Sequence, residues 1–154
     1  MKSILFVCLG NICRSPMAEG ILCHKAEKGG LKLKIDSAGT ESFHVGENPD
    51  RRAITIAKEH GIDISKLVAR QINQDDFVTF DLILVADTQV YNEVIGIARN
   101  ETDKKKIDFI MNLDHPDSNT AVPDPYYGGM DEFEKVFQML DKACDALIEK
   151  LEKK

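Results

Sequence analysis

The sequence predicts an α/β fold in which a parallel sheet lies between layers of helices. Short apolar runs rich in β-branched or aromatic residues recur along the chain, and 3–7 and 81–86 are clear examples. Segments between these runs carry apolar residues at helical spacing. Strands that alternate with helices form parallel sheets through right-handed crossovers, with helices on both faces. A chain of 154 residues has the size of one domain, so we expect residues 1–154 to fold as a unit.

In the N-terminal half we expect two strands, each followed by a helix. The run 3–7 is the first strand, and a helix over 15–28 follows, because Gly29–Gly30 ends it. Residues 31–35 alternate apolar and basic side chains, which is typical of a strand at a sheet edge. The second helix covers 49–59, since its initial Pro-Asp suits a helix N-terminus.

In the C-terminal half the pattern predicts two further strands, which makes four in all. One or two helical turns over 74–79 precede the buried strand 81–86. A helix over 88–98 follows, and a polar connector then leads through residue 106 to a shorter strand over 107–111.

The segment 112–129 has no periodic pattern and contains three of the five prolines. Loops of this length in a compact domain are usually functional or disordered, and the aromatic residues here favour a functional loop. Asp131 is the predicted N-cap of the last helix, and Glu134 completes a capping box. The buried stripe of this helix consists of apolar residues at helical spacing, namely Phe133, Val136, Phe137, Leu140, Ala143, Cys144, Leu147, Ile148 and Leu151.

The composition excludes several classes of protein. A formal net charge of -6 and a pI near 5.2 argue against binding to nucleic acid or to a membrane surface, and Arg51–Arg52 and 104–106 are expected to be ordinary solvated surface. The four cysteines have neither disulfide-scaffold nor zinc-type spacing, which suits a reducing, cytoplasmic compartment. No apolar stretch approaches the roughly 20 residues of a membrane span, and the run 4–9 is too short for a signal-peptide core.

The stretch that connects the first strand to the first helix is Cys8-Leu9-Gly10-Asn11-Ile12-Cys13-Arg14-Ser15-Pro16. Such a loop turns its backbone N–H groups into one concavity, and the helix adds the positive end of its dipole, so the stretch predicts an anion site. Arg14 can grip two oxygens of a phosphate-like group, and Ser15 adds a hydroxyl. These groups favour the thiolate of Cys8, which is then a nucleophile at neutral pH. Gly10 and Asn11 stand where the loop requires positive φ.

The pair of Cys8 and Arg14 is informative because of its position in the chain. A Cys followed six residues later by Arg arises by chance with a probability of roughly 0.13 in this composition, so the pair alone is a weak motif. The stretch lacks the Gly-Lys-Ser/Thr of a nucleotide-binding loop and the three spaced glycines of a dinucleotide fingerprint. Ligands of parallel sheets bind at the carboxyl ends of the strands, where we expect Cys8, Ser37 and Asp87 to meet.

The sequence closely resembles the low-molecular-weight protein tyrosine phosphatase family over nearly its whole length. The resemblance rests on five separated motifs in the family's order, which are Val-Cys-Leu-Gly-Asn-Ile-Cys-Arg-Ser-Pro at 7–16, Asp-Ser-Ala-Gly-Thr at 36–40, Gly-Glu-Asn-Pro-Asp at 46–50, Val-Ala-Arg-Gln-Ile at 68–72 and Asp-Pro-Tyr-Tyr-Gly at 124–128. It implies a three-layer α/β/α domain with a four-stranded parallel sheet of flavodoxin-like winding.

The resemblance also implies a two-step phosphatase that needs no metal and no cofactor. Cys8 attacks phosphorus while Asp124 protonates the leaving phenolate, and Asp124 then acts as base for the water that hydrolyses the cysteinyl-phosphate. Arg14 and the loop amides stabilise the charge on the equatorial oxygens in both steps. Without the resemblance, Asp114, Asp117 and Asp124 are comparable candidates, because all three lie in the long loop.

Support and substrate contacts are implied in the same way. Asn11 and Ser37 would hold residues 8–16, here called the phosphate loop, in shape. Asp87 would either brace that loop or cap the helix predicted over 88–98. Substrate-contacting positions comprise Leu9, Gly10, Asn11, Ile12, Cys13, Ser15, Phe43, Tyr126 and Tyr127. The aromatic members form walls that admit a phenyl phosphate and exclude shorter phosphoserine, although plain packing is an equal interpretation for Tyr127.

Two residues of the phosphate loop bear on alternatives. Family members that act on phosphoarginine tend to carry Thr at the position of Ile12, so Ile favours phosphotyrosine. Cys13 would form a reversible disulfide with Cys8, or it simply fills space under the loop.

Three other functions compete with this interpretation. An arsenate reductase of the same fold needs two relay cysteines, and the remaining Cys23 and Cys144 lack the required spacing. A pure phosphate-binding module would not need the nucleophile and the acid, and a Cys-His protease would not need the Arg-closed loop. The expected partners are tyrosine-phosphorylated proteins, a tyrosine kinase among them, and the expected state is a monomer or weak dimer.

Overall fold

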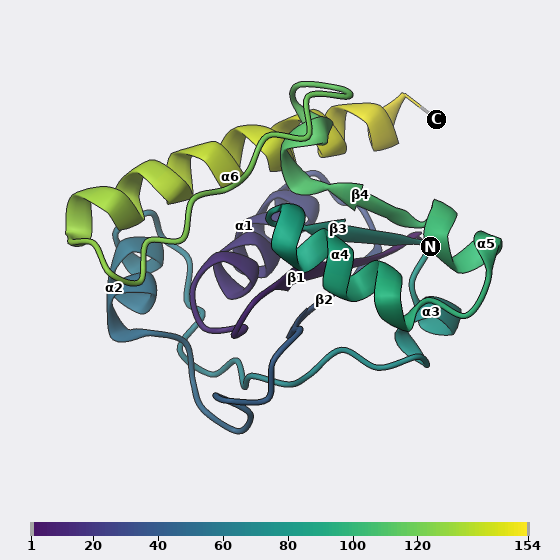
Figure 1. The fold of residues 1–154 in the computed structure, drawn as a ribbon. Coiled ribbons are helices and arrows are strands. Elements are labelled where there is room, and N and C mark those ends of the chain that lie inside the picture. Colours follow the sequence, from purple (N-terminus) through teal and green to yellow (C-terminus); the bar gives the residue numbers. More distant parts are fainter. Residues whose placement is uncertain (1, 154) are drawn as a thin grey trace.

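The computed structural model describes residues 2–153 and contains the expected four-stranded parallel sheet, in the order β2-β1-β3-β4 (Figure 1). The strands are β1 (Lys2–Cys8), β2 (Leu33–Gly39), β3 (Leu82–Val85) and β4 (Ile107–Phe109). The helices are α1 (Arg14–Lys28), α2 (Arg51–Glu59), α3 (Asp76–Thr79), α4 (Thr88–Ile97), α5 (Glu101–Lys105) and α6 (Met130–Glu152), and a 3-10 turn, η1 (Ile110–Leu113), follows β4.

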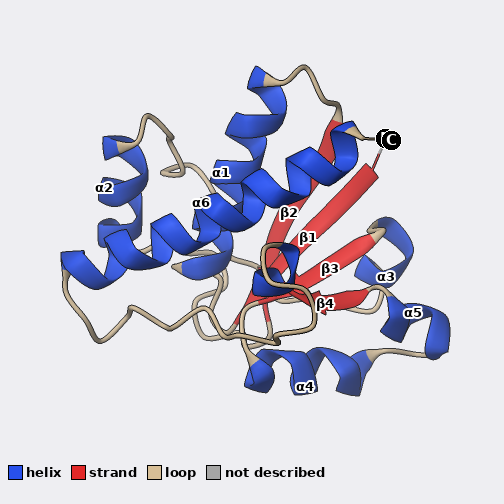
Figure 2. Cartoon of the chain, turned by 90° about the horizontal axis from the view of Figure 1, so that it is seen from above, coloured by secondary structure: helices blue, strands red, loops and turns tan. Residues whose placement is uncertain are grey.

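The helices cover both faces of the sheet, which confirms the predicted three-layer α/β/α fold. Alternate residues of β1 point to opposite faces, so that Phe6 joins a core with α1, α2 and α6, while Val7 joins a second core with α3 and α4. Figure 2 shows these two groups of helices on opposite sides of the strands. The predicted stripe of α6 faces the first core, where Phe133 and Phe137 are among the largest fully buried side chains.

The strand order places the switch point of the fold between β1 and β3. The chain leaves β1 through α1 to reach β2 on one side, and it later crosses to β3 on the other side of β1. Cys8 ends β1, and Asp87 follows β3, so both lie at this switch point. Parallel sheets bind ligands in this position.

Several boundaries differ from the prediction. The fourth strand ends at Phe109 rather than at residue 111, because Ile110 and Met111 belong to η1. The second strand is Leu33–Gly39 rather than 31–35, because β1 offers partners along its whole length and pairs Lys2 with Leu33 through to Cys8 with Gly39. Ser37 therefore lies inside β2 and not after it. The predicted polar connector contains α5, which the side chain of Asn100 caps by accepting the N–H of Asp103 at 2.8 Å.

The predicted capping box of the last helix is wrong. α6 begins at Met130 with Gly129 as its N-cap, and no side chain caps it. Asp131 lies inside the first turn, where its negative charge interacts favourably with the positive end of the helix dipole. The Glu134 carboxylate accepts hydrogen bonds from His60 at 2.9 Å and from Gln138 at 2.6 Å.

Within residues 2–153, no helix combines the length and the apolar character that crossing a bilayer demands.

Gly39, at the end of β2, lies so close to the loop after β1 that no side chain fits. A Cβ atom there would lie 2.8 Å from the carbonyl oxygen of Leu9 and 3.1 Å from the backbone nitrogen of Asn11. We therefore expect Gly39→Ala to lower the free energy of unfolding by about 1–3 kcal/mol, because backbone on both sides must shift. Urea unfolding followed by circular dichroism measures this change.

Gly96→Ala is the matched control, since Gly96 lies in α4 with open space around its Cα. It should raise the free energy of unfolding by about 0.4–1 kcal/mol. Equal effects of the two substitutions would contradict the close approach of β2 to the loop.

Candidate active site

A pocket of about 370 Å³ opens where β1 meets α1. It brings together ten of the twelve residues that the sequence analysis predicted as catalytic or substrate-contacting, and the other two are Asn11 and Ser15. Its lining consists of Cys8, Leu9, Gly10, Ile12, Cys13, Arg14, Glu41, Phe43, His44, Asp124, Tyr126 and Tyr127. The predicted residues Asn11, Ser15, Ser37 and Asp87 lie outside this lining.

Of the fourteen predicted site residues, ten thus line the pocket, and the other four do not.

The thiol and the guanidinium lie at the floor of the pocket. Cys8 and Arg14 are each 3% exposed. The Sγ atom of Cys8 lies 3.0 Å from the hydroxyl oxygen of Ser15. Nη1 of Arg14 donates to Oδ2 of Asp87 at 2.7 Å and to the carbonyl oxygen of Val122 at 2.9 Å. These two bonds fix the guanidinium plane beside the thiol, so the floor has a cation of defined orientation.

Asp87 carries out both of the roles between which the sequence left a choice. One carboxylate oxygen binds Arg14, and the other accepts the N–H of Val90 at 2.9 Å and so caps α4. The same carboxylate therefore orients the guanidinium and accepts a backbone N–H at the start of α4 that has no partner within the helix.

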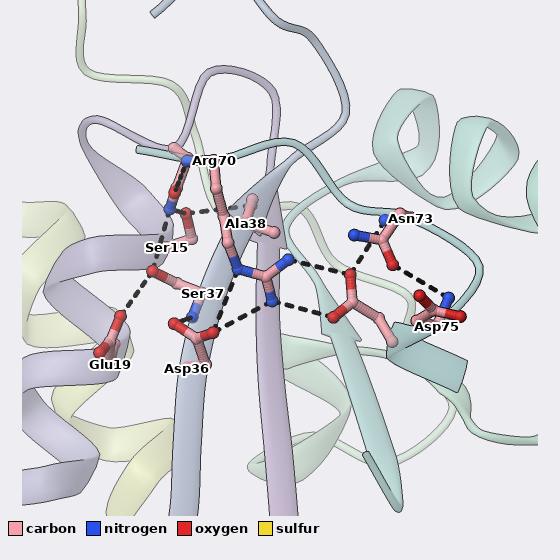
Figure 3. Close-up of polar contacts among 10 residues, drawn as sticks. Ser15, Glu19, Asp36, Ser37, Ala38, Arg70, Asn73 and Asp75 are labelled. Atoms are coloured by element: carbon pink, nitrogen blue, oxygen red, sulfur yellow. Dashed lines mark hydrogen bonds and ion pairs between the residues drawn. The ribbon is translucent and has the colours of Figure 1, made fainter. Parts of the chain in front are cut away.

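Asn11 shapes the loop between β1 and α1. Its φ of 58° is in the left-handed region, as predicted, whereas the positive φ expected at Gly10 is wrong. Its Nδ2 donates to the hydroxyls of Ser15 at 2.7 Å and Ser37 at 2.9 Å, and its Oδ1 accepts the N–H of Arg70 at 3.0 Å. Ser15 Oγ also lies 3.5 Å from the carbonyl oxygen of Ala38 (Figure 3). The amide thus connects the loop to α1, to β2 and to the segment around residue 70.

These contacts also determine where the hydroxyl protons point. Ser37 accepts from Asn11 and therefore gives its own proton to Oε1 of Glu19, 2.6 Å away. Ser15 likewise accepts from Asn11, and two acceptors lie within reach of its own proton, the sulfur of Cys8 at 3.0 Å and the carbonyl oxygen of Ala38 at 3.5 Å. The network thus places next to the sulfur a hydroxyl that can donate to a thiolate, which can only accept.

The carboxylate of Asp124 enters the pocket from the long loop before α6. Its Oδ2 lies 3.9 Å from Nη2 of Arg14, and its Oδ1 accepts the N–H of Tyr126 at 3.0 Å. Of the three aspartates that the loop offers, Asp124 lines the pocket, whereas Asp114 pairs with His115 at 3.3 Å.

Aromatic side chains stand at the mouth of the pocket. Phe43 and Tyr127 are 84% and 93% exposed, and Tyr126 is 37% exposed. His44 lies between the two walls, with ring centroids 6.1 Å from Phe43 and 6.5 Å from Tyr126. Tyr127 contributes to the lining as well as packing edge-on against Tyr126. The opening is therefore an apolar rim above a polar floor.

The sequence of the chain matches a known protein family. The sequence model described as Low molecular weight phosphotyrosine protein phosphatase matches residues 3–154. The chain belongs to this family. The human low molecular weight phosphotyrosine protein phosphatase is 40% identical over 152 residues, which cover 97% of this chain and 95% of the human protein.

Solved structures agree with this assignment. A protein tyrosine phosphatase from Entamoeba histolytica superimposes with a TM-score of 0.92 at 38% identity, over 99% of this chain and 98% of that protein. YfkJ from Bacillus subtilis superimposes with a TM-score of 0.90 at 36% identity, over 99% of this chain and 96% of that protein. The fold predicted from the sequence is thus the fold of the family.

Three residues of the phosphatase that sequence reasoning missed support the site. Glu19 is buried beneath Ser37. Arg70 binds Asp36 at 3.1 Å and both carboxylate oxygens of Asp76 at 3.0 Å (Figure 3). Arg52, which was expected to be solvated surface, is half-buried and bound to the loop that carries Asp124. The helical periodicity of the sequence does not predict the roles of these three residues, because each has a partner that is distant in the sequence.

Cys13 lies under the loop as a buried free thiol, and burial raises the pKa of this thiol. Its disulfide with Cys8 stays a prediction. Among residues 2–153, no three His, Cys, Asp or Glu side chains gather in a way that could hold a metal ion.

Burial raises the pKa of Glu19 from 4.5 to about 7, and the hydrogen bond from Ser37 opposes this shift only in part. Between these values the folded phosphatase holds a proton that the unfolded chain has released, so the free energy of unfolding falls as pH rises from 4.5 to 7. Relative to Glu19→Gln, the wild type should lose on the order of 3 kcal/mol between pH 5 and pH 8. Urea unfolding at the two pH values measures this difference, and parallel pH dependences of the two proteins would contradict it.

Proposed function

We propose that this phosphatase hydrolyses phosphotyrosine in proteins through a cysteinyl-phosphate on Cys8, with Arg14 holding the phosphate and Asp124 transferring protons. The observation that carries the proposal is the meeting of a thiol, a guanidinium and a carboxylate in one pocket. Family membership makes the chain a protein-tyrosine phosphatase and supports these roles. The proposal treats residues 1–154 as one domain.

In the first step, the thiolate of Cys8 attacks phosphorus opposite the phenolic oxygen. The S–P bond forms as the P–O bond breaks, and the protonated carboxyl of Asp124 gives its proton to the leaving oxygen. Asp87 and Val122 engage Nη1 of Arg14, so the edge formed by Nε and Nη2 grips two phosphate oxygens.

In the second step, water attacks phosphorus from the side that the phenol has left. Asp124, now a carboxylate, takes a proton from this water while the P–S bond breaks. Phosphate leaves, and the sulfur of Cys8 recovers its hydrogen bond from Ser15. The Ser15 hydroxyl lies 3.0 Å from the sulfur and can donate to the departing thiolate, which stabilises the thiolate without transferring a proton to it.

The rim supports selection of phosphotyrosine. A phenyl ring can lie between Phe43 and Tyr126 while its phosphate reaches the floor, whereas the short side chain of phosphoserine cannot span the same depth. Ile12 also lines the pocket, and its bulk supports phosphotyrosine rather than phosphoarginine as the substrate. A tyrosine kinase with phosphorylated tyrosines is one substrate of this class. The cytoplasmic location and the monomeric or weakly dimeric state stay predictions.

The arrangement of the remaining cysteines argues against the arsenate reductase alternative. Cys144 is fully buried in α6, where its thiol lies 3.9 Å from the carbonyl oxygen of Ala18. Cys23 lies on α1 and is exposed. Neither residue lines the pocket, so neither is placed to accept oxidation from Cys8.

Replacing Cys8 with Ser should lower kcat for p-nitrophenyl phosphate by about 10⁴-fold or more, because a hydroxyl is a far weaker nucleophile at neutral pH. The floor keeps Arg14 and its partners, so the variant should still bind vanadate or phosphate. Steady-state kinetics and isothermal titration calorimetry measure the two effects. Turnover close to that of the wild type would remove Cys8 as the nucleophile.

Replacing Asp124 with Ala should slow substrates with basic leaving groups most, because these need the proton. We expect kcat/KM to fall about 10²-fold or more for phenyl phosphate and less than about tenfold for p-nitrophenyl phosphate. Asp114→Ala is the matched control, since Asp114 lies in the same loop but outside the pocket lining. A uniform effect of Asp124→Ala on both substrates would count against its role as the acid.

A further inference from the structure

Arg52 connects α2 to the loop that carries Asp124. Its Nε and Nη2 donate to the two carboxylate oxygens of Asp50, each at 3.0 Å, which fixes the guanidinium plane. Its Nη2 also donates to the carbonyl oxygen of Tyr126, and its Nη1 donates to that of Gly128, both at 2.8 Å. One side chain therefore binds the loop at two points just after the acid.

The guanidinium also packs against aromatic rings. Its Cζ lies 4.5 Å from the ring centroid of Phe133, which is fully buried in α6, and 5.6 Å from that of Tyr126. Contacts with a buried ring and with a carboxylate restrict the guanidinium to one orientation. Arg52 is therefore a rigid support rather than a flexible surface charge.

Asp124 lies between two attachments of its loop. On the upstream side, Val122 donates its N–H to the carbonyl oxygen of Ala86 at 2.8 Å and accepts from Arg14 at 2.9 Å. On the downstream side, the backbone N–H and C=O of Tyr126 form the attachment. The N–H of Tyr126 binds Oδ1 of Asp124 at 3.0 Å, and its C=O accepts from Arg52 at 2.8 Å.

The neighbouring Asp50 contacts the phosphate loop through its backbone, in a hydrogen bond that does not involve the Arg52 side chain. The backbone N–H of Asp50 donates to the carbonyl oxygen of Ile12 at 2.8 Å, while the Asp50 carboxylate binds Arg52. The Asp50–Arg52 pair thus links the loop that binds phosphate to the loop that brings the acid, although 74 residues separate Arg52 from Tyr126 in the sequence.

We propose that Arg52 is a positioning residue for proton transfer, which holds Asp124 at a constant distance from the substrate oxygen. The inference rests on the proposed role of Asp124 as the acid. Proton transfer depends steeply on the separation of donor and acceptor, whereas phosphate binding depends on Arg14 and the loop amides. Loss of Arg52 should therefore weaken acid catalysis and leave phosphate binding intact.

The test compares three variants in a series of aryl phosphates. Arg52→Met replaces the guanidinium with a long apolar side chain and so removes every hydrogen bond, and Arg52→Lys keeps the charge without the planar fork. Arg51→Met is the matched control, because Arg51 is the exposed neighbour on the same helix. Thermal unfolding followed by circular dichroism accompanies the kinetics.

Arg52→Met should lower kcat/KM for phenyl phosphate about tenfold more than for p-nitrophenyl phosphate, while the inhibition constant of inorganic phosphate stays within about twofold. Arg52→Lys should show the same selectivity to a smaller extent, and it serves as the test if Arg52→Met does not fold. Arg51→Met should resemble the wild type. In an Asp124→Ala background, Arg52→Met should add no further dependence on the leaving group.

Equal losses for both substrates, weaker phosphate binding, or a further leaving-group dependence in the Asp124→Ala background would overturn the inference. Failure of the proposed function is distinguishable, because Asp124→Ala alone would then show no leaving-group dependence. If Asp124→Ala is selective and Arg52→Met is not, only the role of Arg52 is wrong.

Discussion

The buried amide of Asn11 is the contact on which the active site depends. Its backbone lies in the left-handed region, and its side chain joins the loop to α1, to β2 and to the segment around Arg70. A buried amide is costly unless its donors and acceptor are engaged, and here each of these groups has a partner. The cost of leaving them unpaired opposes any other conformation of the loop. The proposed phosphate site therefore has its shape before a substrate arrives.

The pocket has a buried positive charge although the net charge of the chain is -6. The guanidinium of Arg14 is almost fully buried, and Asp87 at 2.7 Å compensates it. A phosphate group that enters adds negative charge on the opposite edge of the same cation. The excess of acidic residues elsewhere does not weaken this attraction much, because dissolved salt at about 0.1 M screens exposed charges beyond about 10 Å.

Much of the fold could be predicted from the sequence, because strands and amphipathic helices have local periodic patterns. The four strands and the stripe of α6 follow directly from such patterns, and the predicted edge position of the second strand is confirmed. The end of β2 could not be predicted, since its partner strand determines where pairing stops. The choice of Asp124 among the loop aspartates came from the resemblance alone. The role of Arg52 escaped notice because its two carbonyl partners lie far along the chain.

The direction of the hydrogen bonds around Asn11 has a consequence for how the site can vary. The backbone conformation of Asn11 gives the loop its shape, whereas the amide of Asn11, which donates to Ser15, leaves the Ser15 proton available to the sulfur of Cys8. An aspartate at position 11 would have nearly the same outline but would accept from both hydroxyls, turning the Ser15 proton away from the sulfur. Shape and polarity are thus separable properties of this loop, and a variant that preserves the geometry can still lose the chemistry.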